Sequence, residues 1–180
     1  MNDAAGPMLI SASRIEQRVA EMGSEISRDY RDREILVVGI LKGCVVFLAD
    51  LVRQIDPAIP VTIEFMAVSS YGDGATSSGN LRIERGIQDI ASPVEGKDLL
   101  LVEDIVDTGL TIARVRDLLQ SRGARSIRIA ALLDKETSRR HPLNVDYVGF
   151  RIPDKFVVGY GLDFAQRYRN LKEIRVLDAQ

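Results

Sequence analysis

The chain has 180 residues, of which 46% are hydrophobic and 28% charged, and its formal net charge is −2. This composition is typical of one globular domain with a real core, and the charge excludes a bulk basic field that would attract nucleic acid. No apolar run approaches the roughly 18 residues that span a bilayer, and the N-terminus lacks the pattern of a signal peptide. The single cysteine, Cys44, excludes an internal disulfide framework and fits a reducing cytoplasm.

Strands and helices alternate in the predicted elements. Apolar residues at helical spacing predict a helix from Ser11 to Tyr30, with Ser13 and Glu16 as a capping box. The elements that follow are a buried strand at 35–40, a helix at 45–55, a strand at 61–68, a short strand in LRIERGI after residue 80, a strand at 99–103, a helix at 110–121 that Gly123 closes, and strands at 127–133, 145–150 and 157–160. Between them, the glycine-rich segment from Ser69 to Asn80 predicts a mobile loop.

This order predicts a mainly parallel, twisted α/β sheet flanked by helices. The sequence has no internal repeat, low-complexity tract or linker, so we expect residues 1–180 to form a single domain. The pieces after about Ser138 alternate less regularly and predict a small subdomain beside the sheet.

The segment Val102 to Thr111, VEDIVDTGLT, has the features of a sugar-phosphate site. It joins a buried strand to a helix start, whose free N–H groups and positive dipole end bind phosphate. Thr108 and Thr111 add hydroxyls, and a glycine between them lets the backbone approach closely. The adjacent acids Glu103 and Asp104 suit a ribose diol, or a magnesium ion bound to diphosphate, and Asp107 is a candidate general base.

VEDIVDTGLT closely resembles the phosphoribosyl-diphosphate signature of the type I phosphoribosyltransferases. Within that group the chain resembles the hypoxanthine-guanine phosphoribosyltransferase family of the bacterial type. The supporting segments appear in family order over nearly the whole chain: LKGC at Leu41–Cys44, SSY at Ser69–Tyr71, LLDKETSRR at Leu132–Arg140 and VGFRIPDKFVVGYGLD at Val148–Asp163. The last segment belongs to the purine-binding hood and is the most specific of them.

The resemblance implies a purine salvage enzyme that moves the 5-phosphoribosyl group onto N9 of hypoxanthine or guanine, giving IMP or GMP and diphosphate. Asp107 is its expected catalytic residue. The residues implied to bind phosphoribosyl diphosphate are Lys42, Gly43, Glu103, Asp104, Asp107, Thr108, Gly109, Leu110, Thr111 and Arg169. The peptide between Lys42 and Gly43 is expected to be cis, as in many members of the family.

The resemblance also assigns the purine site. Lys135 would donate to the 6-oxygen of the base, Phe156 would stack on its ring and Val157 would meet its edge, with Asp163 nearby. Glu103, Asp104 and Asp163 would hold magnesium, and Ser70 and Tyr71 would begin a flexible loop that closes over the site and excludes water. Two positions depart from the family pattern, since Cys44 and Leu110 replace smaller or more polar residues; the first reads as structural, and neighbouring backbone donors compensate for the second.

Other functions remain open at this point. A xanthine-preferring transferase is the nearest alternative, whereas Lys135 disfavours adenine. An RNA-binding regulator on the same fold predicts a basic surface and no hood, and a plain nucleotide-binding module would not need Asp107, Lys135 and Asp163 together. The expected partners are small-molecule substrates, with no nucleic acid and no membrane, and the expected assembly is a cytoplasmic homodimer or homotetramer.

Overall fold

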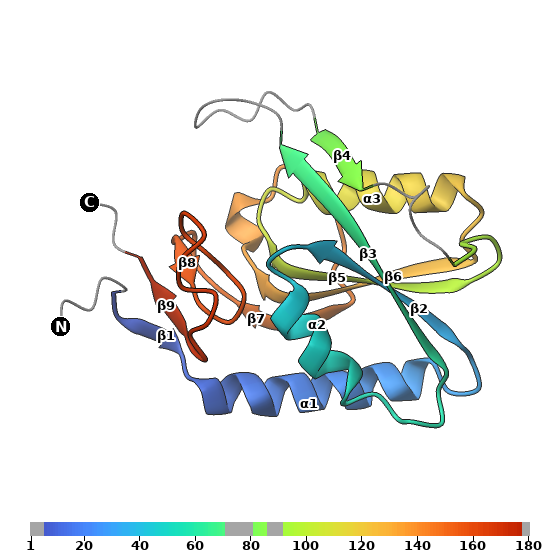
Figure 1. Ribbon diagram of the computed structural model, residues 1–180, viewed down its shortest axis with the longest axis horizontal. Coiled ribbons are helices and arrows are strands. Elements are labelled where there is room, and N and C mark those ends of the chain that lie inside the picture. Colours follow the sequence, from blue (N-terminus) through green and yellow to red (C-terminus); the bar gives the residue numbers. More distant parts are fainter. Residues whose placement is uncertain (1–5, 71–80, 86–91, 178–180) are drawn as a thin grey trace.

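The structure is a computed structural model that describes residues 6–70, 81–85 and 92–177. Its centre is a twisted sheet in the order β4-β3-β2-β5-β6-β7 (Figure 1). The strands are β2 (Ile35–Leu41), β3 (Val61–Ser70), β4 (Leu81–Arg85), β5 (Asp98–Val106), β6 (Ser126–Asp134) and β7 (Tyr147–Arg151). All neighbours pair in parallel except β4, which is antiparallel to β3, so the expected mainly parallel sheet is confirmed.

Helices cover both faces of this sheet (Figure 1). Helices α1 (Ala12–Asp29) and α2 (Val45–Val52) pack on one face, and α3 (Leu110–Ser121) packs on the other. The interior strands are apolar on both sides because each face is buried under a helix layer, and Leu99 to Val102 are fully buried. The continuous apolar runs that predicted buried strands are explained by this two-sided cover.

The predicted capping box at the start of α1 is wrong. The N-cap is Ser11, whose hydroxyl accepts from the N–H of Arg14 at 3.4 Å, and Ser13 is already inside the helix. Ser11 has the extended backbone of an N-cap, with φ −73° and ψ 154°. A cap requires that non-helical backbone, and the sequence offers two serines two residues apart for it.

Several element boundaries also differ from the prediction. β5 continues past Glu103 to Val106, because β6 stays in register with it as far as the pair Val106–Asp134. β3 includes Ser69 and Ser70, so the start of the expected mobile loop is strand, and residues 71–80 lie outside the described part of the chain. Helix α2 ends at Val52 rather than at Ile55, and the residues that follow form turns.

A second, three-stranded sheet forms the hood beside the main sheet (Figure 1). It pairs β1 (Met8–Ile10) and β8 (Val157–Val158) with β9 (Ile174–Val176), all antiparallel. The expected boundary near Ser138 is therefore too early, since β7 still belongs to the main sheet. The contribution of β1 was not predicted, because no local pattern links the two ends of the chain. Within the described residues, no helix is both long and apolar enough to cross a membrane.

Candidate active site

The predicted site residues of the main sheet lie at or just after the carboxyl ends of three neighbouring strands. β2 ends at Leu41, β5 at Val106 and β6 at Asp134. Because these strands run parallel, their carboxyl ends open on the same side, which is where open α/β sheets bind ligands. The N–H of Lys135 donates to the carbonyl of Val106 at 3.0 Å and so joins the last two loops at their base.

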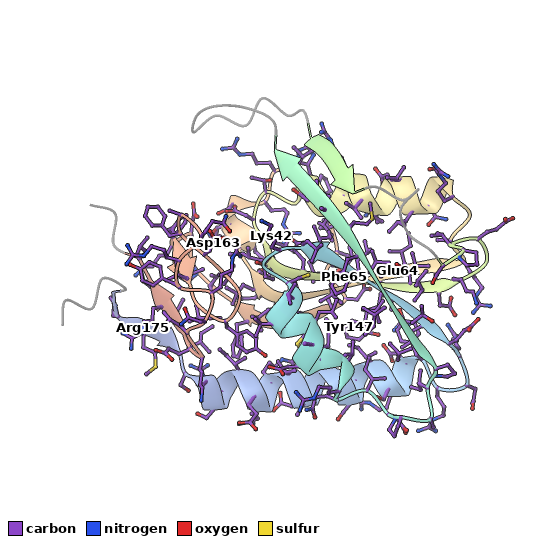
Figure 2. The ribbon with its side chains drawn as sticks, viewed as in Figure 1. Lys42, Glu64, Phe65, Tyr147, Asp163 and Arg175 are labelled. Carbon is purple, nitrogen blue, oxygen red and sulfur yellow. The ribbon has the colours of Figure 1, made fainter. Side chains whose placement is uncertain are left out.

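A cavity of about 360 Å³ lies at this edge, within the size range of small-molecule sites. Sheet and hood both line it, and Figure 2 shows Lys42 and Asp163 close together although they are distant in sequence. The predicted residues that line it are Lys42, Gly43, Glu103, Asp104, Asp107, Lys135, Phe156, Val157, Asp163 and Arg169. One cavity thus collects residues from both predicted subsites.

An adjoining hollow of about 90 Å³ is lined by the residues predicted to hold the 5-phosphate. They include Asp107, Thr108, Gly109 and Thr111. Leu110 does not line this hollow, and it is the first residue of α3. Tyr71 and the side chain of Ser70 lie outside the described residues, so the expected closing loop stays a prediction.

The turn after β2 approaches the acidic residues so closely that position 43 requires glycine. A Cβ on Gly43 would lie 1.6 Å from Oδ2 of Asp104. On the hood side, a Cβ on Gly161 would lie 2.2 Å from the carbonyl oxygen of Gly43, and Gly161 has a φ of +100°. Two glycines therefore allow the turn, the acids and the hood to meet.

The expectation of a cis peptide between Lys42 and Gly43 is wrong. The cis bond lies one residue earlier, between Leu41 and Lys42. Outside proline, residue type does not reveal a peptide's isomer, and only the backbone of the folded loop identifies the bond.

Glu103 and Asp104 are adjacent carboxylates with raised pKa values. Burial raises the pKa of Asp104 to about 6, although its Oδ1 accepts from the N–H of Ile105 at 2.9 Å. Burial, together with the charge of Asp104, raises the pKa of Glu103 well above its usual range. The Oε2 atom of Glu103 is buried and accepts no hydrogen bond from the described residues. An unpartnered buried carboxylate oxygen beside a second acid is the donor set that suits a hard cation.

Lys135 is a buried cation between two carboxylates. Its side chain is 8% exposed, and Nζ lies 3.2 Å from Oδ2 of Asp107 and 3.1 Å from Oδ1 of Asp154. Asp107 is half-exposed and lines both hollows, so it lies where the sugar phosphate and the base would meet. Asp107 therefore borders the space open to a ligand in either hollow.

The loop between β5 and α3 has the geometry of a phosphate cradle. Gly109, with a φ of +81°, is the N-cap of α3 and offers no side chain to cap the helix. The N–H of Leu110 donates to Oγ1 of Thr108 at 3.4 Å, whereas the other N–H groups of the first helical turn have no acceptor within the helix and can meet a ligand. The carbonyl of Thr108 accepts hydrogen bonds from the N–H groups of Arg140 and His141 at 3.0 and 3.1 Å. These bonds hold the loop against the segment that follows β6.

The hood contributes aromatic and charged residues to the other side of the cavity. Phe156 is 53% exposed, and its ring meets Phe164 edge-on with centroids 5.7 Å apart. Arg169 donates to the carbonyl of Gly161 at 2.7 Å and forms an ion pair with Asp163 at 2.6 Å. The ring of Phe156 is thus exposed enough to contact a planar ligand. Arg169 holds the carboxylate of Asp163 in position.

Asp154 and Gly161 shape the site but were not among the predicted residues. Asp154 pairs with Lys135, and its only sequence signal was its place two residues before Phe156. Gly161 lies in the segment Val148–Asp163, but no role was predicted for it, because its close approach to Gly43 depends on tertiary contact. Arg139, in the segment LLDKETSRR, forms an ion pair with the buried Asp134 and lies against Gly109, so it supports the loop between β5 and α3.

The acids of the site do not form a metal cluster by themselves. In the part of the chain that the structure describes, no three His, Cys, Asp or Glu side chains gather closely enough to hold an ion. A cation at Glu103 and Asp104 would need further oxygen ligands from a bound molecule.

Comparison with known proteins agrees with this geometry. Residues 9–165 match the family model of the phosphoribosyl transferase domain. A hypoxanthine-guanine phosphoribosyltransferase of Bacillus subtilis is 47% identical over 170 residues, which cover 94% of this chain and 92% of that protein. The bifunctional protein TilS/HprT of Listeria innocua is 44% identical over 177 residues; the match covers 98% of this chain and only 26% of that longer protein. The crystal structure of a hypoxanthine phosphoribosyltransferase from Staphylococcus aureus matches with a TM-score of 0.90 at 42% identity, covering 99% of this chain and 94% of that one. With this family match over most of its length, the chain belongs to the phosphoribosyl transferase domain family.

Proposed function

We propose that this enzyme transfers the 5-phosphoribosyl group from phosphoribosyl diphosphate to N9 of hypoxanthine or guanine and releases diphosphate. The observation that carries the proposal is the single cavity in which the phosphate loop, the acidic pair, Lys135 and Phe156 meet. The relative in Bacillus subtilis is named for both hypoxanthine and guanine and the one in Staphylococcus aureus for hypoxanthine, which supports these substrates. As its alternative, a xanthine-preferring enzyme would use the same groups, because xanthine also carries a 6-oxygen.

The 5-phosphate would bind in the smaller hollow. Backbone N–H groups at the start of α3 and the hydroxyls of Thr108 and Thr111 would donate to it. The positive end of the helix dipole favours the same dianion. This binding would place the ribose toward Glu103 and Asp104, which can accept hydrogen bonds from its hydroxyls.

Diphosphate and magnesium would occupy the side of the cavity toward the hood. Lys42, Gly43 and Arg169 would contact the diphosphate, and Glu103, Asp104 and Asp163 would face the cation. The unpartnered Oε2 of Glu103 supports this assignment. When bound, magnesium would neutralise the charge of the leaving diphosphate.

The purine would lie between Phe156 and the carboxyl ends of the central strands. Phe156 would stack on the ring, backbone groups of Val157 would meet its edge, and Lys135 would donate to its 6-oxygen. An amino group at that position would face a second donor, and such a mismatch in a buried site is strongly rejected. Lys135 therefore favours 6-oxopurines over adenine.

Displacement at C1 of the ribose develops positive charge on the sugar, and water would capture it. Asp107 would hold or accept a proton of the purine as N9 attacks, while the hood and the loop that begins at Ser70 and Tyr71 would exclude water. Orientation of the purine against C1 would supply much of the acceleration.

The test is a release assay with purified protein, magnesium and phosphoribosyl diphosphate. Hypoxanthine, guanine, xanthine and adenine are supplied in turn, and diphosphate is measured. We expect release with hypoxanthine and guanine and at most a trace with adenine. Faster release with xanthine would move the assignment to the xanthine-preferring alternative. Absence of base-dependent release, together with RNA binding in a gel shift, would favour the regulator.

Residues 1–180 would act as one domain in the cytoplasm, in a homodimer or homotetramer. Val45 on α2 and Ile63 on β3 are apolar side chains that are 43% and 42% exposed, and self-association could cover them. Light scattering after size-exclusion chromatography would measure the assembly, and a monomer at micromolar concentration would contradict it.

A further inference from the structure

We propose that Asp154 is a positioning residue that holds the ammonium group of Lys135 where it meets the 6-oxygen of the purine. The inference rests on the proposed function, because it takes Lys135 as the group that reads the base. Asp154 lies in the hood turn between β7 and β8, and it would control how well Lys135 recognises the base.

The first step is the number of donors on Lys135. An ammonium has three N–H groups and no acceptor. In the structure, one N–H meets Asp107 at 3.2 Å and another meets Asp154 at 3.1 Å. The Lys135 side chain is 8% exposed, so water reaches it poorly. One donor is left, and its direction is set by the two carboxylates that hold the others.

The second step is where the two carboxylates come from. Asp107 belongs to the loop after β5, whereas Asp154 belongs to the turn that carries Phe156 two residues later. The N–H of Lys155 donates to the carbonyl of Pro153 at 2.8 Å, so this turn is locally closed. Asp154 therefore fixes the Lys135 ammonium relative to the ring of Phe156, and a base stacked on that ring would find the free N–H at a constant place.

The third step is the competition between the two acids. Without Asp154, Lys135 would pair with Asp107 alone and would draw closer to it. That movement would turn the ammonium away from the base and would engage the carboxylate that serves the proton of the purine. The hydrogen bond from Lys135 lowers the pKa of Asp154, so Asp154 carries its charge at neutral pH and can act as the opposing anchor.

The test compares Asp154→Asn with two controls. Asp154→Glu keeps the carboxylate, and Glu136→Gln removes the same charge from a neighbouring exposed ion pair, which joins Glu136 to Arg151 and not to the ammonium of Lys135. Calorimetry measures the Kd of each protein for inosine 5′-monophosphate and for purine riboside 5′-monophosphate, which lacks the 6-oxygen. Diphosphate release gives the KM for hypoxanthine and for phosphoribosyl diphosphate.

For Asp154→Asn we expect the Kd for inosine 5′-monophosphate and the KM for hypoxanthine to rise about tenfold, the equivalent of about 1.4 kcal/mol. The Kd for purine riboside 5′-monophosphate and the KM for phosphoribosyl diphosphate should stay within about twofold, because neither ligand uses the donor. Asp154→Glu should keep most of the affinity, and Glu136→Gln should match the unchanged protein.

A purely structural role for Asp154 would weaken both nucleotides equally, and that result would overturn the inference. So would an Asp154→Asn protein that binds both nucleotides normally, or an Asp154→Glu protein as weak as the Asn variant. Failure of the proposed function would look different, because the unchanged protein would then release no diphosphate with hypoxanthine.

Discussion

Gly43 lies so close to Asp104 that adding one methyl group at position 43 should lower the activity. In Gly43→Ala, the new Cβ would lie 1.6 Å from Oδ2 of Asp104 and 2.6 Å from its Cγ, whereas real Cβ contacts essentially never fall below 3.0 Å. The carboxylate of Asp104 must therefore move by more than 1 Å. A displacement of about 1 Å in a catalytic site can cost about 10²-fold in rate, so we expect kcat/KM for phosphoribosyl diphosphate to fall by about that factor.

The fold should survive this change, because the displaced group is a side-chain carboxylate and the core is untouched. The assay is diphosphate release at saturating hypoxanthine, with thermal unfolding measured in parallel. Gly96→Ala is the matched control: Gly96 lies in a turn with no atom of the described residues within 4 Å of its Cβ position, and its φ of +71° makes the variant less stable without reaching the site. If Gly43→Ala keeps normal kcat/KM, the placement of Asp104 does not limit the reaction and the steric reasoning fails.

Three further predictions concern charged groups. Asp107→Ala should lower kcat by about 10² to 10⁴-fold while calorimetry still detects binding of magnesium and phosphoribosyl diphosphate, and near-normal turnover would remove its catalytic role. Asp98→Asn should cost about 1–2 kcal/mol of unfolding free energy at pH 7, because hydrogen bonds from Arg125 and Ser126 lower the pKa of Asp98 to about 2. That stabilisation is present above pH 4 and is lost as the pH falls toward 2, so urea titrations should show the variant and the unchanged protein converging in acid; a constant difference would contradict it. Magnesium affinity should weaken as the pH falls through about 6, since burial raises the pKa of Asp104 to that value and a cation requires the carboxylate; a flat affinity between pH 5 and 8 would exclude Asp104 as a ligand.

Local features of the sequence predicted the main sheet well. The apolar runs at 35–40 and 99–102 are buried on both faces, and each predicted strand lies in the sheet or the hood. The start of α3 at Leu110 was also predicted correctly, because a strand, a glycine and a helical repeat follow one another within a few residues. Such signals depend only on residues that are close together in the sequence, so they can be recognised without the tertiary structure.

The loop between β5 and α3 was predictable for the same reason, and its binding of phosphate stays a prediction. Its residues, from Asp107 to Thr111, are consecutive, and their chemistry follows from the helix start that they form. The purine residues Lys135 and Phe156 were assigned only by resemblance, since a lysine after a strand and an exposed phenylalanine have many ordinary explanations. Ser13 shows the limit of local reasoning even for a cap, since Ser11 takes that role through its backbone conformation.

By itself, the sequence VEDIVDTGLT determined a buried strand, a loop and a helix start, and it predicted a sugar-phosphate site there. Only the tertiary structure decided what surrounds that site: Gly43 against Asp104, Lys135 between Asp107 and Asp154, and a hood that pairs the first strand of the chain with the last. The physical reason is distance along the chain. A strand–loop–helix unit is encoded by adjacent residues, whereas an ion pair or a close glycine contact between separate loops exists only after the sheet has brought their ends to one edge.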